Sequence, residues 1–158
     1  MGVAGSGKST VGRMLAAALN WPYFEADDFH SPGNKDKMSR GLPLDDVDRA
    51  PWLNAIRIKI SECRASGRSA VFSCSALKEK YRSSLGLDAT DTILVHLTGD
   101  IKTIRERVGR REGHYLKAAL VQSQFDALEP PRAAITIDIK LTPEMIVQTI
   151  LQKIQSAL

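Results

Sequence analysis

The sequence predicts an α/β fold in which parallel strands form a sheet with helices on both faces. Strand-like and helix-like segments alternate along the 158 residues, the order expected when helices connect parallel strands. A second observation is the stretch GVAGSGKST at residues 2–10, which fits G-x-x-x-x-G-K-[ST] and runs into a helical pattern. Together they predict a P-loop NTPase fold: three α/β/α layers, a parallel sheet with four visible strands, and a helical lid.

The residue types of this loop suit phosphate binding. Glycine tolerates backbone angles that a Cβ forbids, so successive N–H groups can form a nest around an anion. Lys8 is expected to reach the β- and γ-phosphates of ATP, and the hydroxyl of Ser9 to coordinate Mg²⁺. The bland alternative is a glycine-rich turn before an ordinary helix. The predicted nucleotide-binding residues are Gly2, Val3, Ala4, Gly5, Ser6, Gly7, Lys8, Ser9 and Thr10.

The loop lacks the strand that normally precedes and aims it, because it begins at Gly2. We therefore expect Met1 to be an internal methionine, with about ten more residues before it, the length of a strand and a short lead.

The first helix is expected over residues 8–19, with an apolar stripe at helical spacing and Asn20 as its C-cap. A short strand over residues 23–26 then ends in Asp27, Asp28 and His30. Ligands of open α/β sheets sit beyond the carboxyl ends of strands, which makes these side chains candidates for chemistry. The alternatives are a solvated turn or helix cap for the two carboxylates, and a structural hydrogen bond for the histidine.

A polar, turn-rich insert covers about residues 31–50. We interpret it as a cap over a substrate pocket, with a mobile surface loop as the alternative. The next helix is expected over residues 51–66, with Asp48 as its cap and Pro51 near its first turn.

A buried strand over residues 69–74 leads to Lys78 and Arg82. Because these cations are four residues apart, we expect them on one face at the start of a helix, where they could hold an anionic substrate. Solvated surface side chains are the alternative. A strand at residues 92–97 and a helix at 100–110 follow, with His96 as a packing residue of the strand.

A basic run over residues 102–117 overlaps this helix, and a lid is predicted over about residues 107–128. Its arginines could close over ATP and stabilise charge on the transferring phosphoryl group. A last strand at 135–139 precedes a helix capped by Thr142, with Pro143 in its first turn.

Composition limits the class of protein. A net charge of +4 is too mild to indicate nucleic acid, and it suits a protein with anionic ligands. No apolar run approaches the ~20 residues that cross a membrane, and no secretory signal is visible. Cys63 and Cys74 are expected to be buried thiols. We therefore expect one domain over residues 1–158, in the cytoplasm, without membrane or nucleic-acid partners.

Several stretches together resemble one family over nearly the whole chain. The phosphate loop is shared by many NTPases, whereas PLDD, CSALK and QFDALE are more specific. The stretches are residues 2–9, ADDFH at 26–30, GLPLDDVDRAPWL at 41–53, CSALKEKYR at 74–82, Arg107, REGHY at 111–115 and QSQFDALEPP at 122–131. They resemble the thermoresistant-type gluconate kinases, which are small relatives of shikimate and adenylate kinases.

The resemblance implies transfer of the γ-phosphoryl of ATP, with Mg²⁺, to the 6-hydroxyl of D-gluconate. Asp27 is then the first choice to accept or orient the hydroxyl proton, similar to the acidic position of shikimate kinases, and Asp28 is the second. Arg107 and Arg111 match the lid arginines. The expected catalytic residues are Lys8, Asp27, Asp28, Arg107 and Arg111. The expected gluconate-binding residues are His30, Arg49, Lys78, Arg82 and Gln124.

Two other functions remain open at this stage. The chain could be a related kinase acting on shikimate or a nucleoside monophosphate, or a nucleotide-binding regulatory protein without turnover. A small-molecule substrate is the expected partner, and a homodimer is the assembly considered.

Overall fold

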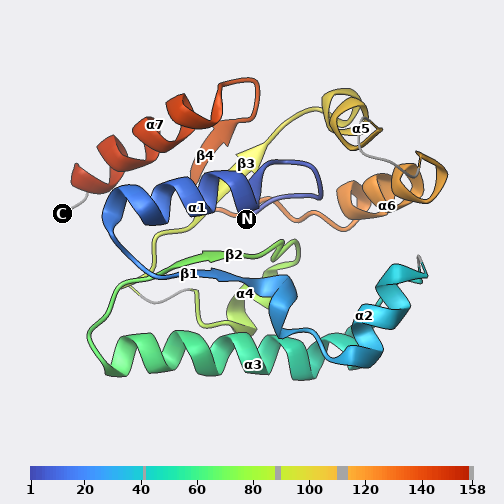
Figure 1. The fold of residues 1–158 in the computed structure, drawn as a ribbon, viewed down its shortest axis with the longest axis horizontal. Coiled ribbons are helices and arrows are strands. Elements are labelled where there is room, and N and C mark those ends of the chain that lie inside the picture. Colours follow the sequence, from blue (N-terminus) through green and yellow to red (C-terminus); the bar gives the residue numbers. More distant parts are fainter. Residues whose placement is uncertain (41, 88–89, 110–113, 157–158) are drawn as a thin grey trace.

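The computed structural model describes residues 1–40, 42–87, 90–109 and 114–156. Strands and helices alternate as expected (Figure 1). The strands of this described part are β1 (Tyr23–Glu25), β2 (Val71–Ser73), β3 (Val95–Thr98) and β4 (Ile135–Asp138). Its helices are α1 (Lys8–Leu19), η1 (Ala26–Phe29, a 3₁₀ helix), α2 (Pro32–Ser39), α3 (Asp46–Ala65), α4 (Glu79–Ser84), α5 (Ile101–Gly109), α6 (His114–Asp126) and α7 (Pro143–Gln155).

The strands form two parallel pairs. β1 pairs with β2, placing Phe24 opposite Phe72, and β3 pairs with β4, placing Leu97 opposite Ile137. Between β2 and β3 lies the start of the chain, where Met1 and Gly2 hydrogen-bond to residues on either side. The predicted parallel α/β arrangement is confirmed, and the described strands form two separate parallel pairs.

Two cores lie on either side of these strands. α1 packs against β2 and α7, and its residues Val11 and Leu15 are buried as the stripe predicted. Gly12 allows this close approach, because a Cβ there would lie 2.4 Å from Ser73 Oγ. The second core joins α3 and α4 beneath β1 and β2 through Ile56 and other apolar residues (Figure 1).

Local capping differs from the expectation at one helix. α3 begins at Asp46, and Asp45 is its N-cap. Asp48, predicted as the cap, is instead the third helical residue and completes a capping box with Asp45. Pro51 therefore lies inside α3. The insert is also not a plain loop, because α2 occupies residues 32–39 with Ser31 as its cap.

The predicted caps of two other helices, α1 and α7, agree with the structure. α1 spans the predicted residues, and Asn20 ends it in the left-handed conformation with φ 54°. The Thr142 side chain accepts from Met145 N at the start of α7. Both cysteines are free thiols; Cys74 is buried as predicted, whereas Cys63 is only partly buried, so the prediction is wrong for Cys63. Among the described helices, none has the length and apolar character to cross a membrane.

Candidate active site

The phosphate loop has the backbone that an anion cradle needs. Gly5 and Gly7 have φ values of 81° and 90°, in the region that favours glycine. Gly7 is the N-cap of α1 and supplies no side chain, so the first N–H groups of the helix are left for a ligand. A Cβ on Gly7 would meet nothing within 4 Å. The loop therefore fits phosphate groups of a nucleotide.

Lys8 lies across this loop. Its Nζ donates to the carbonyl oxygen of Val3 at 2.9 Å, and its own carbonyl accepts from Ser73 Oγ at 2.9 Å. Burial lowers the pKa of Lys8, while the nearby carboxylates of Asp27 and Glu25 act in the opposite direction. The Lys8 ammonium thus points into the loop, and the carboxylates of Asp27 and Glu25 act on it electrostatically.

Oxygen ligands suitable for Mg²⁺ gather beside the loop. The hydroxyl of Ser9 lies close enough to the Tyr23 hydroxyl to act on its pKa, which burial raises. Tyr23 donates to Glu25 Oε2 at 2.6 Å. Within the described residues no group of three His, Cys, Asp or Glu side chains could hold a metal. The carboxylate of Glu25, at the end of β1, was not among the predicted site residues.

The two neighbouring aspartates of η1 face different partners. Asp27 acts electrostatically on Lys8 and on His30. The backbone carbonyl of Asp28 accepts from Lys35 Nζ at 3.3 Å. Both residues are exposed. Asp27 is therefore the carboxylate that lies near the phosphate loop.

His30 is a packed histidine. Its ring stacks on Trp52, with the centroids 4.4 Å apart, and its exposed fraction is only 8%. Trp52 Nε1 donates to the carbonyl of Ala26 at 2.7 Å, and Asn34 Nδ2 lies 3.5 Å from His30 Nδ1. Burial lowers the pKa of His30, partly offset by Asp27. These contacts fit the structural alternative, in which His30 holds η1 against α3.

A charged network around Tyr81 connects α3 and α4. Arg49 Nη1 donates to the Tyr81 hydroxyl at 3.1 Å, and this hydroxyl donates to Asp46 Oδ1 at 2.7 Å. Lys80 pairs with Asp46 Oδ2 at 2.5 Å. Hydrogen bonds from Lys80 and then Tyr81 lower the pKa of Asp46 to about 2. Lys78 Nζ lies 5.8 Å from the Tyr81 ring centroid and the Arg49 guanidinium 5.4 Å. Lys80 Nζ lies 5.5 Å from the same centroid, so the ring contacts three cations.

Lys78 and Arg82 do not share a helix face, so that prediction is wrong. Lys78 is the N-cap of α4 with an extended backbone, φ −95° and ψ 146°. Arg82 is buried, and its Nη1 donates to the carbonyls of Ala76 and Leu77, both at 3.0 Å. Ala76 has a φ of 44°, a conformation that costs a residue with a Cβ about 1–2 kcal/mol. Arg82 thus stabilises a strained turn.

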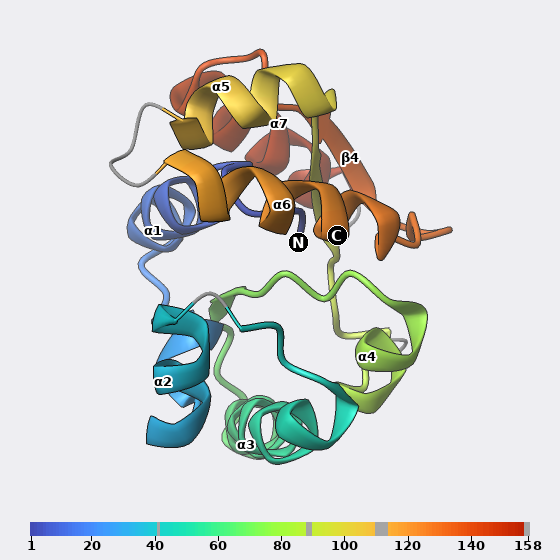
Figure 2. The same cartoon turned by 90° about the vertical axis from the view of Figure 1, so that its right-hand side faces the viewer.

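The lid elements contact the loop from the other side of the molecule. Gln124 of α6 accepts from Ala4 N at 2.6 Å through its Oε1, so it touches the phosphate loop directly. Arg107 Nη2 donates to the carbonyl of Ile139 at 2.6 Å. Figure 2 shows α5 and α6 with α1 above, and α2, α3 and α4 below. Arg111 lies outside the described residues.

A phosphate loop heading a helix, beside a parallel sheet and a strand-end carboxylate, defines a nucleotide-dependent phosphotransferase of the P-loop class. The chain matches the family model "Shikimate kinase" over residues 4–155 and belongs to that family.

Within this class, similar proteins include several gluconokinases. A probable gluconokinase of Rattus norvegicus is 43% identical, over 84% of this chain and 82% of that protein. The thermoresistant gluconokinase of Escherichia coli K12 is 33% identical, over 98% of this chain and 91% of that protein. A crystal structure of a gluconokinase from Sinorhizobium meliloti 1021 is 41% identical with a TM-score of 0.82, over 94% of this chain and 85% of the other. The predicted resemblance is confirmed.

Proposed function

We propose that the chain transfers the γ-phosphoryl of ATP to the 6-hydroxyl of D-gluconate, giving 6-phospho-D-gluconate and ADP. The observation that carries this is the juxtaposition of Lys8 in the loop with Asp27 in η1. The kinship with gluconokinases supports gluconate as the acceptor. Phosphoryl transfer depends mainly on positioning and charge stabilisation, which a preformed loop and fixed side chains provide.

On the nucleotide side, residues 2–10 hold the phosphates and Lys8 reaches the β- and γ-phosphates. Ser9 would hold Mg²⁺, with Glu25 and Asp27 nearby; the ion would neutralise charge that develops on the phosphates. Gln124 fixes Ala4, one residue before Gly5, and therefore acts on the loop rather than on the sugar acid. Arg107 and Arg111 complete the lid and stabilise the charge of the transferring group.

On the acceptor side, Asp27 accepts or orients the hydroxyl proton, with Asp28 as the second choice. Arg49 and Lys78 bind the gluconate carboxylate, because both cations lie against Tyr81. Arg82 supports this site by holding the 76–77 turn, and its remaining donors are candidates for the same carboxylate. His30, stacked on Trp52, acts as a packing residue that holds η1, and with it Asp27, in place.

The remaining parts of the proposal concern the setting of this reaction. Residues 1–158 act as one kinase domain, with α2 in the substrate cap (residues 31–50) and α6 in the lid (residues 107–128). The partner is a small sugar acid, with no nucleic acid or membrane involved. We place the enzyme in the cytoplasm, with a homodimer as the assembly to test.

An acceptor panel tests the function. ADP production is measured with ATP, Mg²⁺ and either gluconate, shikimate or AMP. We expect turnover with gluconate at least about 100-fold above the other two, because a site built for a substrate's polar groups rejects analogues that leave them unpaired. Faster turnover with shikimate or AMP than with gluconate would show that gluconate is not the preferred acceptor. Nucleotide binding without ADP production from any acceptor would instead favour a regulatory protein.

A further inference from the structure

The QFDALE stretch, residues 124–129, forms the end of α6 and the chain just after it. Its first residue contacts the phosphate loop, where Gln124 Oε1 accepts from Ala4 N at 2.6 Å. Its last residue, Glu129, contacts the turn that leads into α4. Figure 2 shows α6 above this turn and α4 below. One short stretch therefore reaches both the proposed nucleotide side and the proposed acceptor side.

Glu129 brackets Lys78 with two hydrogen bonds. Its backbone N–H donates to the carbonyl of Leu77 at 2.9 Å, and its side-chain Oε2 accepts from Glu79 N at 2.6 Å. These two backbone groups immediately precede and follow Lys78. The Lys78 side chain makes no capping bond at the start of α4, so Glu129 supplies the acceptor that a capping side chain usually provides. The backbone of Lys78 is thus held from both sides.

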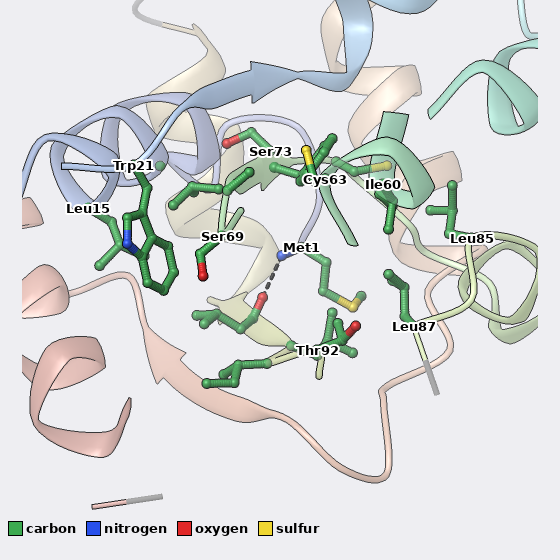
Figure 3. A pocket seen from close by; sticks show the side chains of 18 of the residues that line it. Met1, Leu15, Trp21, Ile60, Cys63, Ser69, Ser73, Leu85, Leu87 and Thr92 are labelled. Carbon is green, nitrogen blue, oxygen red and sulfur yellow. Dashed lines mark hydrogen bonds between the residues drawn. The ribbon is translucent and has the colours of Figure 1, made fainter. Parts of the chain in front are cut away.

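The turn that Glu129 contacts depends on polar partners. Ala76 has a φ of 44°, and such a conformation persists only where the surroundings enforce it. The turn borders a mainly apolar cavity of about 450 Å³, whose lining includes Ala76 and Leu85 (Figure 3 labels Leu85). Apolar side chains cannot supply hydrogen bonds to the turn. Its carbonyl at residue 77 instead accepts from both Glu129 N and Arg82 Nη1.

The negative charge of Glu129 has local partners. The N–H groups at the start of a helix favour a nearby carboxylate. Hydrogen bonding to Asp46 raises the pKa of Lys80, and the charge of Glu129 acts in the same direction, so Lys80 also lies within its electrostatic reach. Both partners are groups other than the Lys78 ammonium. Glu129 therefore orients Lys78 through the backbone and not through an ion pair.

The neighbouring chain fixes Glu129 itself. Leu128 N donates to the carbonyl of Phe125 at 3.2 Å, and both side chains pack against the core cluster that contains Leu77. Two prolines follow at positions 130 and 131, and a proline restricts the residue before it to extended conformations. The side chain of Glu129 is nevertheless exposed. Its substitution therefore leaves no cavity in the core.

We propose that Glu129 is a positioning residue of the acceptor side, which holds Lys78 in the place where it binds the substrate carboxylate. Glu129 acts through the backbone groups on either side of Lys78, so it serves binding and not the chemical step. This inference rests on the proposed function, because it takes an anionic acceptor at Lys78. It also separates the two ends of the stretch: Gln124 serves ATP, and Glu129 serves gluconate.

Steady-state kinetics of Glu129→Ala and Glu129→Gln test the proposal. We expect Glu129→Ala to raise the KM for gluconate about tenfold, the usual effect of losing a hydrogen bond that involves a charged group. The KM for ATP should stay within about twofold and kcat within about threefold, because the phosphate loop and Asp27 are untouched. Glu129→Gln keeps an acceptor oxygen for Glu79 N and should recover most of the loss.

Two controls distinguish positioning from a general loss of stability. Thr142→Ala removes a side-chain acceptor from Met145 N at the start of the distant α7, and it should leave both KM values unchanged. Gln124→Ala should give the opposite result to Glu129→Ala, with the larger effect on the KM for ATP. An unchanged KM for gluconate in Glu129→Ala, or the same rise in Thr142→Ala, would overturn the proposal.

The unmodified chain distinguishes this failure from a failure of the proposed function. If it phosphorylates gluconate while Glu129→Ala behaves normally, only the role of Glu129 is refuted. If it prefers shikimate or AMP, the proposed function fails and Glu129 is still tested, since both acceptors are anions and the KM for the preferred one is measured instead. No turnover of any of the three acceptors would refute both.

Discussion

The proposed nucleotide side and the proposed acceptor side of the site are built in different ways. The nucleotide side is one contiguous stretch, residues 2–10, whose shape depends on glycine φ angles and on the N-terminus of α1. The acceptor side joins side chains far apart in sequence, such as Arg49 and Asp46 with Tyr81. Backbone cradles accept any phosphate of the right size, whereas a side-chain network can select one acceptor. Substitutions on the two sides should therefore change different kinetic constants.

The largest expected effect distinguishes the two aspartates of η1. Asp27→Asn should lower kcat by about 100- to 10,000-fold, the usual contribution of general acid–base catalysis. The matched control is Asp28→Asn, which removes the neighbouring charge and should keep kcat within about threefold. Steady-state kinetics with gluconate measure both. A near-normal kcat for Asp27→Asn would show that Asp27 is not the base. A large loss of kcat in Asp28→Asn alone would identify Asp28 as the base.

The next effect isolates the acceptor network. Tyr81→Phe keeps the ring that holds Arg49 and Lys78 but removes the hydroxyl between Arg49 and Asp46. Losing hydrogen bonds to charged groups costs ~1.5 kcal/mol, so the KM for gluconate should rise about tenfold. The KM for ATP should stay unchanged. Arg49→Lys should not preserve the geometry of the network around Tyr81, because lysine lacks the guanidinium fork. A rise in the KM for ATP alone would show that the network belongs to the nucleotide side.

A smaller effect tests the opposite side. Gln124→Ala removes the acceptor of Ala4 N, and the loss of one neutral hydrogen bond of ~1 kcal/mol should raise the KM for ATP about fivefold. The control is Gln122→Ala on the same helix, which loses bonds only to Arg105 and Asp126. Gluconate binding should be unaffected by both. If Gln124→Ala instead raised the KM for gluconate, the result would support the original prediction that Gln124 lies in the sugar-acid pocket.

The smallest expected effect is on stability as a function of pH. Burial lowers the pKa of both His30 and His96 from 6.5. The unfolded chain takes up protons near pH 6.5, while the folded chain takes them up only at lower pH. Stability present above pH 6.5 should therefore fall as the pH drops from 7.5 towards 5.5. Urea unfolding measures this slope, and the His30→Gln, His96→Gln double variant should reduce it without abolishing it, because burial also lowers the pKa of the Met1 amine to about 5. A slope of opposite sign would contradict the burial of these rings.

Local signals in the sequence predicted local features well. Asn20 and Thr142 were identified from capping chemistry, because a cap depends on residues three or four positions away. Asp45 was missed as the cap of α3 because three aspartates lie within residues 45–48, and each of them satisfies the same capping rule. The phosphate loop was likewise evident from spacing alone.

Features that depend on tertiary contacts were not visible in the pattern. Lys78 and Arg82 have helical spacing, yet the helix begins after Lys78. Arg82 instead donates hydrogen bonds to carbonyls of a strained turn. Gln124 reaches Ala4 across 120 positions of sequence. No periodicity encodes such pairs, because they arise only when the sheet brings the two segments together.

Identification of the product tests the central claim most directly. The chain is incubated with ATP, Mg²⁺ and gluconate, and the products are analysed by mass spectrometry and phosphorus NMR. We predict one molecule of ADP for each molecule of phosphogluconate, with the phosphoryl group on the oxygen of carbon 6. ADP without phosphogluconate, or a phosphoryl group at another position, would contradict the assignment of acceptor and base.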